Sequence, residues 1–187
     1  ARRWSAQIVN YADDFVICCK GRAEPAMDAM RGMMEKLKLT VNDDKTHLCQ
    51  LPQERFDFLG YTFGRCYNRE TGRAYIGTRP SPKSIKRMVE SITQETDRRR
   101  TLLDAGFVVG RLNRKLIGWA NYFCLGPVSP AYRAINTHVT QRLRQWLCKK
   151  HKVRGNGGTR YPDRYLHETL GLVNLPGRTH DLPWAKA

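Results

Sequence analysis

Short apolar runs separated by polar breaks are the main pattern of the first 40 residues. Ala6–Asn10 and Phe15–Cys19 are rich in β-branched residues and flank Tyr11-Ala12-Asp13-Asp14, which predicts two strands joined by a tight acidic turn. After Gly21, apolar residues recur at spacings of three and four. This spacing predicts an amphipathic helix over 24–39.

Residues 41–80 continue with strand-like segments. Val41–Leu51 predicts a loop and a strand, and the aromatic, partly alternating Arg55–Phe63 predicts a further strand. A polar turn at 68–73 precedes Ala74–Thr78, which is the predicted return strand. Antiparallel strands with one helix place this part of the chain in the α+β class.

From residue 81 onward the apolar period is that of helices. Ser81 before Pro82 predicts a helix start, because serine caps helices and proline fits their first turn. Two more helices are predicted, one over 107–124 and one after Gly126-Pro127, and their short connections indicate a small helical bundle. Beyond a flexible glycine-rich break, the tail is predicted to hold one short helix at 162–170 and then extended chain.

Basic residues are concentrated in the predicted helical part. The chain carries 33 Lys and Arg against 17 Asp and Glu, a formal charge of +16. Residues 1–81 hold 13 basic and 10 acidic side chains, whereas residues 82–187 hold 20 and 7. Such an excess favours a polyanionic partner, nucleic acid before an anionic membrane, although a basic surface without a partner is the simpler alternative. No apolar run approaches 18 residues, so no membrane span is expected.

The two adjacent carboxylates of the predicted hairpin are candidates for metal binding. Like charges side by side repel, and a hard cation such as Mg²⁺ relieves that repulsion because it takes carboxylate oxygens as ligands. Two such ions can stabilise the attacking and leaving oxygens of a phosphoryl transfer. On the Asp13-Asp14 dipeptide alone, an ordinary hairpin turn is the simpler interpretation, since aspartate is common there.

Three segments in a fixed order resemble reverse transcriptases. Tyr11-Ala12-Asp13-Asp14 resembles the YxDD motif, with the alanine typical of group II intron, retron and related bacterial enzymes. Asn42–Thr46 resembles the family's next block, which carries a lysine after the palm helix. Phe58-Leu59-Gly60-Tyr61 resembles the block that forms the primer grip. The order and spacing of the three segments are more specific than any one of them.

The resemblance implies roles for these residues. Asp13 and Asp14 would be the catalytic carboxylates that hold Mg²⁺, with Mn²⁺ as an alternative, and deoxynucleoside triphosphates would be the substrates. The residues implied to contact primer and template are Tyr11, Ala12, Lys45, Phe58, Leu59, Gly60 and Tyr61. Simpler interpretations stay open, with Lys45 as a surface lysine, the aromatic segment as strand core and Gly60 as a bulge.

The helical part resembles a narrower group. Pro82–Arg87 followed by Leu112–Phe123 is similar to the maturase-specific region, or domain X, of group II intron proteins. In that family the region is the thumb, which grips the template–primer duplex and binds intron RNA to assist its folding and splicing. The C-terminal ends of bacterial members are also similar to the end of this chain, at Tyr165-Leu166, at Leu170-Gly171-Leu172 and at residues 183–187.

Basic side chains of this part are the candidate RNA contacts, because lysine and arginine neutralise phosphates. The candidates are Lys83, Lys86, Arg87, Arg98, Arg99, Arg100, Arg111, Arg114, Lys115, Arg142, Arg144, Lys149 and Lys150. The aromatic residues between them are expected mainly in the bundle core, because they lie at helical spacing from leucines. These aromatic residues are Trp119, Tyr122, Phe123 and Trp146.

The predicted organisation has three parts. Residues 1–80 are expected to be the end of a reverse transcriptase palm, residues 81–153 a helical thumb, and residues 154–187 a basic tail that is a candidate reduced DNA-binding segment. The family's third catalytic aspartate and its fingers lie upstream of the YADD segment. The 187 residues alone are therefore expected to bind RNA without polymerase activity, with an N-terminal fingers and palm part as a missing partner.

The expected function is that of a group II intron-type RNA-directed DNA polymerase and maturase. Its partners would be the intron RNA, the primer–template duplex and the DNA target of retrohoming, in a bacterial cytoplasmic ribonucleoprotein or at the nucleoid. Two alternatives stay open. One is a CRISPR-associated or other bacterial reverse transcriptase of group II descent, and the other is a stand-alone intron RNA-binding fragment without catalysis.

Overall fold

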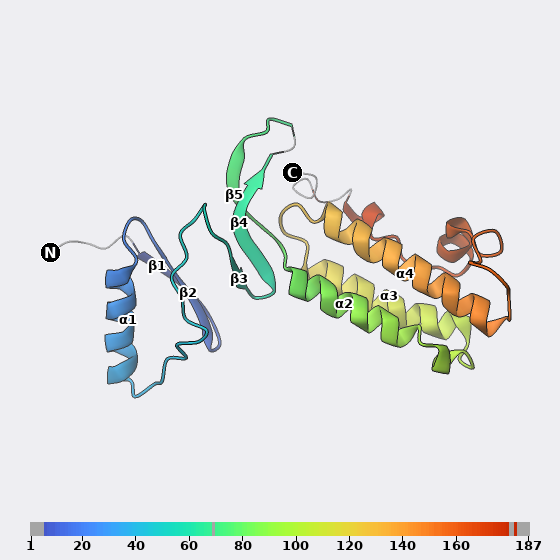
Figure 1. Cartoon of the computed structure of the whole chain (residues 1–187), viewed down its shortest axis with the longest axis horizontal. Helices are drawn as coiled ribbons and strands as arrows, with labels where there is room; N and C mark the ends of the chain where they lie inside the picture. The colour runs from blue at the N-terminus through green and yellow to red at the C-terminus, as the bar shows by residue number, and fades with distance from the viewer. Residues whose placement is uncertain (1–5, 69, 180–181, 183–187) are drawn as a thin grey trace. The chain divides into compact units, whose positions relative to one another are not determined.

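A computed structural model describes residues 6–68, 70–179 and 182 of the chain (Figure 1). The chain forms two compact units, Ala1–Glu54 and Arg55–Ala187. Antiparallel strands occur in both units and helices dominate the second, which confirms the predicted α+β class. No helix within the described residues is long and apolar enough to cross a membrane.

The first unit contains a hairpin and one helix. Strands β1 (Ala6–Tyr11) and β2 (Asp14–Cys19) pair antiparallel, from Ala6 opposite Cys19 to Tyr11 opposite Asp14, as predicted. Helix α1 (Glu24–Lys36) ends before the predicted residue 39, because Lys38 takes a left-handed φ of 55° that terminates the helix.

The strand predicted within residues 41–51 does not form. This segment makes turns instead. The side-chain oxygen Oδ1 of Asn42 accepts from the backbone N–H of Lys45 at 3.2 Å, and the Thr46 hydroxyl donates to the Asn42 carbonyl at 2.8 Å. Such local hydrogen bonds satisfy backbone groups that a sheet would otherwise use, so the prediction of a strand was wrong for this segment.

The sheet of the second unit has three antiparallel strands, β3 (Phe56–Phe58), β4 (Tyr61–Tyr67) and β5 (Ala74–Pro80), in that order. The single strand predicted over 55–63 is wrong, because the chain reverses at Leu59 and Gly60. Their φ angles of 51° and 79° match the positive pair that a tight two-residue hairpin turn requires.

Three long helices follow the sheet: α2 (Pro82–Glu95), α3 (Ala105–Tyr122) and α4 (Ser129–Lys150). A 3₁₀ turn, η1 (Arg98–Arg100), lies between α2 and α3. Ser81 caps α2 by accepting from the N–H of Ser84 at 3.2 Å, as predicted. Asp104 caps α3 in the same way, so that helix begins two residues before the predicted start.

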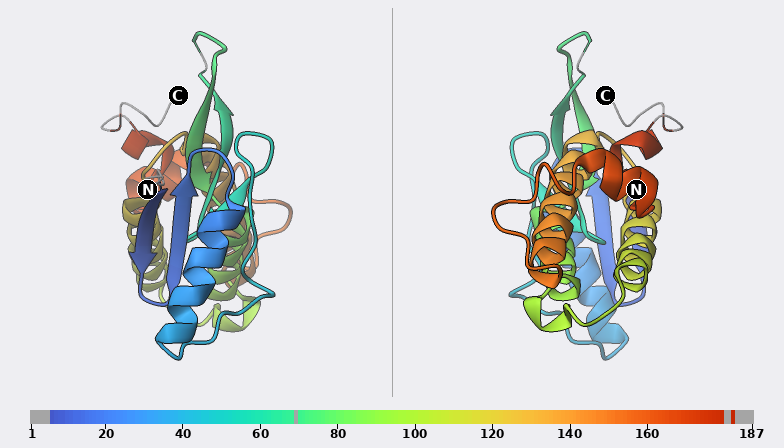
Figure 2. Two further views of the ribbon diagram at one scale, coloured as in Figure 1. Left: turned by 90° about the vertical axis from the view of Figure 1, so that its left-hand side faces the viewer. Right: turned by 90° about the vertical axis from the view of Figure 1, so that its right-hand side faces the viewer.

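The three long helices lie side by side, as both Figure 1 and Figure 2 show, and enclose one apolar core. Its fully buried side chains include Ile92, Leu112, Leu116, Ile135, Leu143, Trp146, Leu147, Leu166 and Leu175. Burial of one such leucine contributes about 2 kcal/mol. The core position predicted for Phe123 and Trp146 is confirmed, whereas Trp119 is partly buried and Tyr122 is 54% exposed.

The tail packs into this core and does not extend away from it. Tyr161 and Leu172 are buried in the same cluster as the helices, together with Leu166 and Leu175. The tail contains a single π-helical turn, η2 (Tyr165–Thr169), inside the predicted short helix, and a 3₁₀ turn, η3 (Pro176–Thr179), that contacts α4. Extended chain was therefore the wrong prediction for 176–179. The closing segment 183–187 lies outside the described residues.

Candidate nucleic-acid interface

The acidic hairpin of the first unit presents two carboxylates to solvent. Ala12 and Asp13 form the turn between the paired residues Tyr11 and Asp14, and all four are exposed. Ala12 takes a φ of 51°, which is rare for a residue with a Cβ and is found preferentially at functional sites. The turn therefore holds Asp13 and Asp14 next to each other at one end of the hairpin.

A divalent cation fits the donor chemistry of this pair, because carboxylate oxygens are the ligands that hard cations prefer. Within the part of the chain that the structure describes, no group of three or more His, Cys, Asp or Glu side chains gathers around a common point. Asp13 and Asp14 are the two carboxylates of the hairpin that have this donor chemistry. Lys45 lies in the same unit, in an exposed turn that α1 braces through an ion pair of 2.6 Å between Arg31 and Asp43.

The Leu59–Gly60 turn of the second unit is hydrogen-bonded to two helices. The Gly60 carbonyl accepts from the Ser84 hydroxyl at 2.8 Å and from the Ser81 N–H at 2.9 Å, both at the start of α2. The Leu59 carbonyl accepts from the Tyr122 hydroxyl at 2.9 Å, at the end of α3. Segments that the sequence assigned to different domains therefore form one site.

Aromatic packing completes this junction. Tyr61 is buried, and its hydroxyl donates to the Tyr122 carbonyl at 2.5 Å. Its ring lies 5.0 Å from the ring of Phe123, which in turn lies 4.8 Å from that of Trp119. Burial raises the pKa of the Tyr61 hydroxyl, so this group stays protonated as a hydrogen-bond donor. Phe58, two residues before Gly60, is half-buried at the end of β3.

A groove of about 400 Å³ opens beside the junction. Its walls come from the Leu59–Gly60 turn, from α2 and from α3, and include Arg87, Ser91, Trp119 and Tyr122. Arg87 is exposed, and the indole N–H of Trp119 is buried without a hydrogen-bond partner among the described residues. A cation and an exposed aromatic ring suit a nucleic-acid strand, which offers phosphates and bases.

The predicted RNA-binding cations fall into three groups. Exposed side chains form the first: Lys83, Lys86, Arg87, Arg98, Arg99, Arg114 and Lys149. The second group is held within the fold. In it, Arg142 donates to the Thr93 and Thr96 carbonyls, Arg144 to the Tyr161 carbonyl, and Lys150 to the Thr101 and Leu103 carbonyls. These bonds give the three residues a structural task besides any RNA contact.

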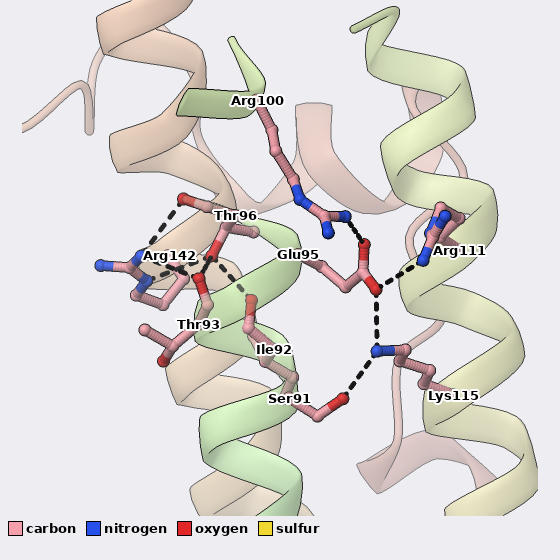
Figure 3. A network of polar contacts seen from close by, with 9 residues as sticks. All are labelled: Ser91, Ile92, Thr93, Glu95, Thr96, Arg100, Arg111, Lys115 and Arg142. Atoms are coloured by element: carbon pink, nitrogen blue, oxygen red, sulfur yellow. Dashed lines mark hydrogen bonds and ion pairs between the residues drawn. The ribbon is translucent and has the colours of Figure 1, made fainter. Parts of the chain in front are cut away.

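Arg100, Arg111 and Lys115, the remaining candidates, converge on one buried carboxylate (Figure 3). Glu95, the last residue of α2, has a side chain only 4% exposed. Arg100 reaches one of its oxygens at 2.6 Å, while Arg111 and Lys115 reach the other at 3.0 and 2.8 Å. Burial by itself raises the pKa of Glu95, but hydrogen bonds from Lys115 and Arg111 and the Arg100 charge outweigh burial and lower it.

Glu95 was missed by reasoning from the sequence. The available signal was electrostatic, because a glutamate in the last turn of a helix is disfavoured by the helix dipole unless cations surround it. The cations that surround it come from η1 and from α3, up to 20 positions along the chain. Their convergence on Glu95 depends on how α2 and α3 pack.

Two known family models match parts of the chain. A family model described as "Group II intron, maturase-specific domain" matches residues 85–162, and one described as "Reverse transcriptase (RNA-dependent DNA polymerase)" matches residues 1–63. No curated protein matches the chain. The first match covers the long helices and most basic candidates, and the second covers the acidic hairpin and the Leu59–Gly60 turn. The chain therefore resembles a C-terminal fragment of a group II intron-type reverse transcriptase/maturase, with a reverse transcriptase match at its start and a maturase-specific match over its helices.

Proposed function

We propose that the second unit binds group II intron RNA and the template–primer duplex, and that it assists folding and splicing of the intron. The observation that carries this proposal is the groove beside the Leu59–Gly60 turn. The turn matches the reverse transcriptase model, whereas most of α2 and all of α3 match the maturase model. One groove shared by both segments suits a protein that handles a primer strand and a structured RNA with the same surface.

The exposed cations support the same proposal. Arg87 lies in the groove, Lys83 and Lys86 lie on the same helix, and Arg98, Arg99 and Arg114 are exposed on η1 and α3. Cations of this kind bind phosphates by releasing condensed counterions, so the affinity they confer falls steeply with salt. A bacterial cytoplasmic ribonucleoprotein, acting on a DNA target during retrohoming, is the proposed setting.

We propose further that Asp13 and Asp14 hold Mg²⁺, or Mn²⁺ in its place, for the reverse transcriptase reaction on deoxynucleoside triphosphates. A divalent ion there would stabilise charge on the oxygens of the transferred phosphoryl group. Affinity for such an ion rises with the number and geometry of its ligands. Two carboxylates alone are therefore expected to bind the ion too weakly for catalysis. We expect the 187 residues by themselves to bind RNA without extending a primer.

The test combines filter binding of a structured intron RNA with extension of a DNA primer on an RNA template in Mg²⁺. The 187-residue chain should bind the RNA and leave the primer unextended. Asp13→Ala with Asp14→Ala should change RNA affinity less than about twofold, because the substitution removes no cation. If the 187-residue chain extends the primer and the two substitutions abolish that extension, the two carboxylates suffice for catalysis. This outcome would overturn the proposed inactivity.

Charge-neutralising variants test the binding surface. Changing Arg98, Arg99 and Arg114 to Gln should lower the slope of log affinity against log salt by up to about three, because each phosphate that is no longer neutralised lowers it by about one. The matched control changes Lys20, Lys36 and Lys38 to Gln, three exposed lysines of the first unit. Equal effects of the two triple variants would mean that the helical surface has no special role in RNA binding.

A further inference from the structure

The buried carboxylate of Glu95 holds three cations that come from two other elements of the second unit. Arg100 belongs to η1, and Arg111 and Lys115 belong to α3, one helical turn apart. A single buried ion pair would serve only to neutralise the carboxylate. Here three positive charges meet one negative charge, so the cluster keeps a formal charge of +2.

These cations retain donors that Glu95 does not use. The bonds to Glu95 occupy one N–H group of each guanidinium, and an arginine presents five. The side chains of Arg100, Arg111 and Lys115 are 38%, 38% and 34% exposed, so each is anchored at its buried side and open to solvent at the other. Lys115 is braced further by its bond of 2.7 Å to the Ser91 hydroxyl, and the Arg111 guanidinium lies 5.9 Å from the Phe107 ring centre.

The surroundings of the cluster are also cationic. Arg98 and Arg99 are exposed on the same 3₁₀ turn as Arg100, and Arg142 of α4 donates to carbonyls of the last turn of α2 (Figure 3). Asp97 is a carboxylate at the start of this turn, and it accepts a hydrogen bond from the backbone N–H of Arg99. That bond lowers the pKa of Asp97, and the positive charges of Arg99, Arg98 and Arg142 lower it further. An anion that approaches the cluster therefore meets an attractive field.

We propose that Arg100, Arg111 and Lys115 form a preorganised site for one backbone phosphate of RNA, and that Glu95 is the positioning residue of this site. The proposal rests on RNA binding by the second unit. Guanidinium groups match phosphate oxygens with paired N–H donors, and a phosphate has enough oxygens to accept from three cations. Without Glu95 the three cations would repel one another, and each long side chain would have to lose its rotamer freedom when the phosphate binds.

Charge and position make opposite predictions for one substitution. Glu95→Gln removes a negative charge beside the cations, so a purely electrostatic argument predicts tighter RNA binding. The amide also places an N–H₂ group where one oxygen accepted from a cation, so the positioned arrangement is lost. If Glu95 acts by positioning, the substitution weakens RNA binding although the protein becomes more positive.

The experiment measures RNA affinity between about 50 and 300 mM salt for the wild-type chain and for Glu95→Gln. A matched control is Glu168→Gln, which makes the same change in the exposed ion pair with Arg164. We expect Glu95→Gln to bind about tenfold more weakly, with a salt slope smaller by about one, and Glu168→Gln to bind no more weakly than wild type. In a chain where Arg100, Arg111 and Lys115 are all Gln, the further change of Glu95 to Gln should not weaken RNA binding again.

Equal or tighter binding by Glu95→Gln would overturn the proposal and leave Glu95 with a structural task alone. If circular dichroism shows that this variant does not fold, Lys115→Gln replaces it, since Glu95 then keeps both arginines. Lys115→Gln should weaken RNA binding several-fold more than Lys36→Gln, an exposed lysine of α1, and equal effects would again overturn the proposal. A wild-type chain that does not bind RNA would refute the proposed function itself.

Discussion

Replacing Gly60 by alanine tests whether the turn that joins the sheet to the helices is under steric constraint. Gly60 has a φ of +79°, and a Cβ there would lie 2.9 Å from the Ser84 hydroxyl and 3.0 Å from Cζ of Phe123. The left-handed backbone costs about 1–2 kcal/mol for a residue with a Cβ. Displacing Ser84 also weakens its hydrogen bond to the Gly60 carbonyl, which contributes about 1 kcal/mol. We therefore expect Gly60→Ala to lower the free energy of unfolding by about 3 kcal/mol.

Gly72 supplies the matched control. It lies in the loop between β4 and β5 with a φ of +66°, and a Cβ there would meet no atom of the described residues within 4 Å. Gly72→Ala therefore incurs the backbone cost without the steric cost, about 1–2 kcal/mol. The difference between the two variants isolates the contact with α2 and α3.

Urea unfolding followed by tryptophan fluorescence is a suitable assay, because Trp119 and Trp146 both pack in the second unit. In a domain of this size, 1 kcal/mol corresponds to about 4 °C in Tm, so thermal unfolding provides a second measurement. Equal destabilisation by the two variants would refute the argument, since it would mean that the turn can move away from the helices without cost. Gly60→Ala should also weaken RNA binding, because the turn lines the groove.

Two further predictions concern the stability of the helical unit. Arg142→Ala should lower the free energy of unfolding by about 2 kcal/mol, because it removes hydrogen bonds to the Thr93 and Thr96 carbonyls and to the Thr96 hydroxyl. The control is Arg114→Ala, a change of an exposed arginine, which should alter the free energy of unfolding by less than about 0.5 kcal/mol. Urea unfolding measures both variants. Burial, assisted by the charge of Arg142, lowers the pKa of His138, so the unfolded chain takes up a proton at a higher pH than the folded chain. The free energy of unfolding should therefore fall as the pH drops below about 6.5. His138→Asn should reduce the fall in unfolding free energy between about pH 7.5 and 5.5. If the fall is unchanged in this variant, His138 is not its cause.

Local chemistry explains which parts of the fold were predictable. The hairpin around Asp13 and the start of α2 at Ser81 depend on residues within a few positions of each other, because a strand pair with a tight turn and a capped helix are formed by neighbours in sequence. The division of Arg55–Phe63 into two strands was missed, since Leu59 before Gly60 is a weaker turn signal than asparagine or aspartate before glycine.

The sequence patterns did not predict contacts between residues that are far apart along the chain. Tyr122 was expected in the bundle core, yet its ring is half exposed and its hydroxyl bonds to the Leu59 carbonyl, 63 positions away. Arg142 and Lys150 were assigned to RNA on charge alone, yet both donate to backbone carbonyls near the ends of other helices. Leu166 and Leu175 of the tail belong to the core of the bundle, a contact that the sequence patterns did not indicate.

The sequence by itself determined the acidic turn, the helical period of the second half and the excess of positive charge there, because motif, period and net charge are properties of the residues in order. Only the tertiary structure decided which cations stay exposed, which ones meet at Glu95, and that the Leu59–Gly60 turn and the last turn of α3 form one groove. The reason is physical. A charged or polar side chain binds whichever partner packing brings within about 3 Å, and packing joins residues that are far apart along the chain.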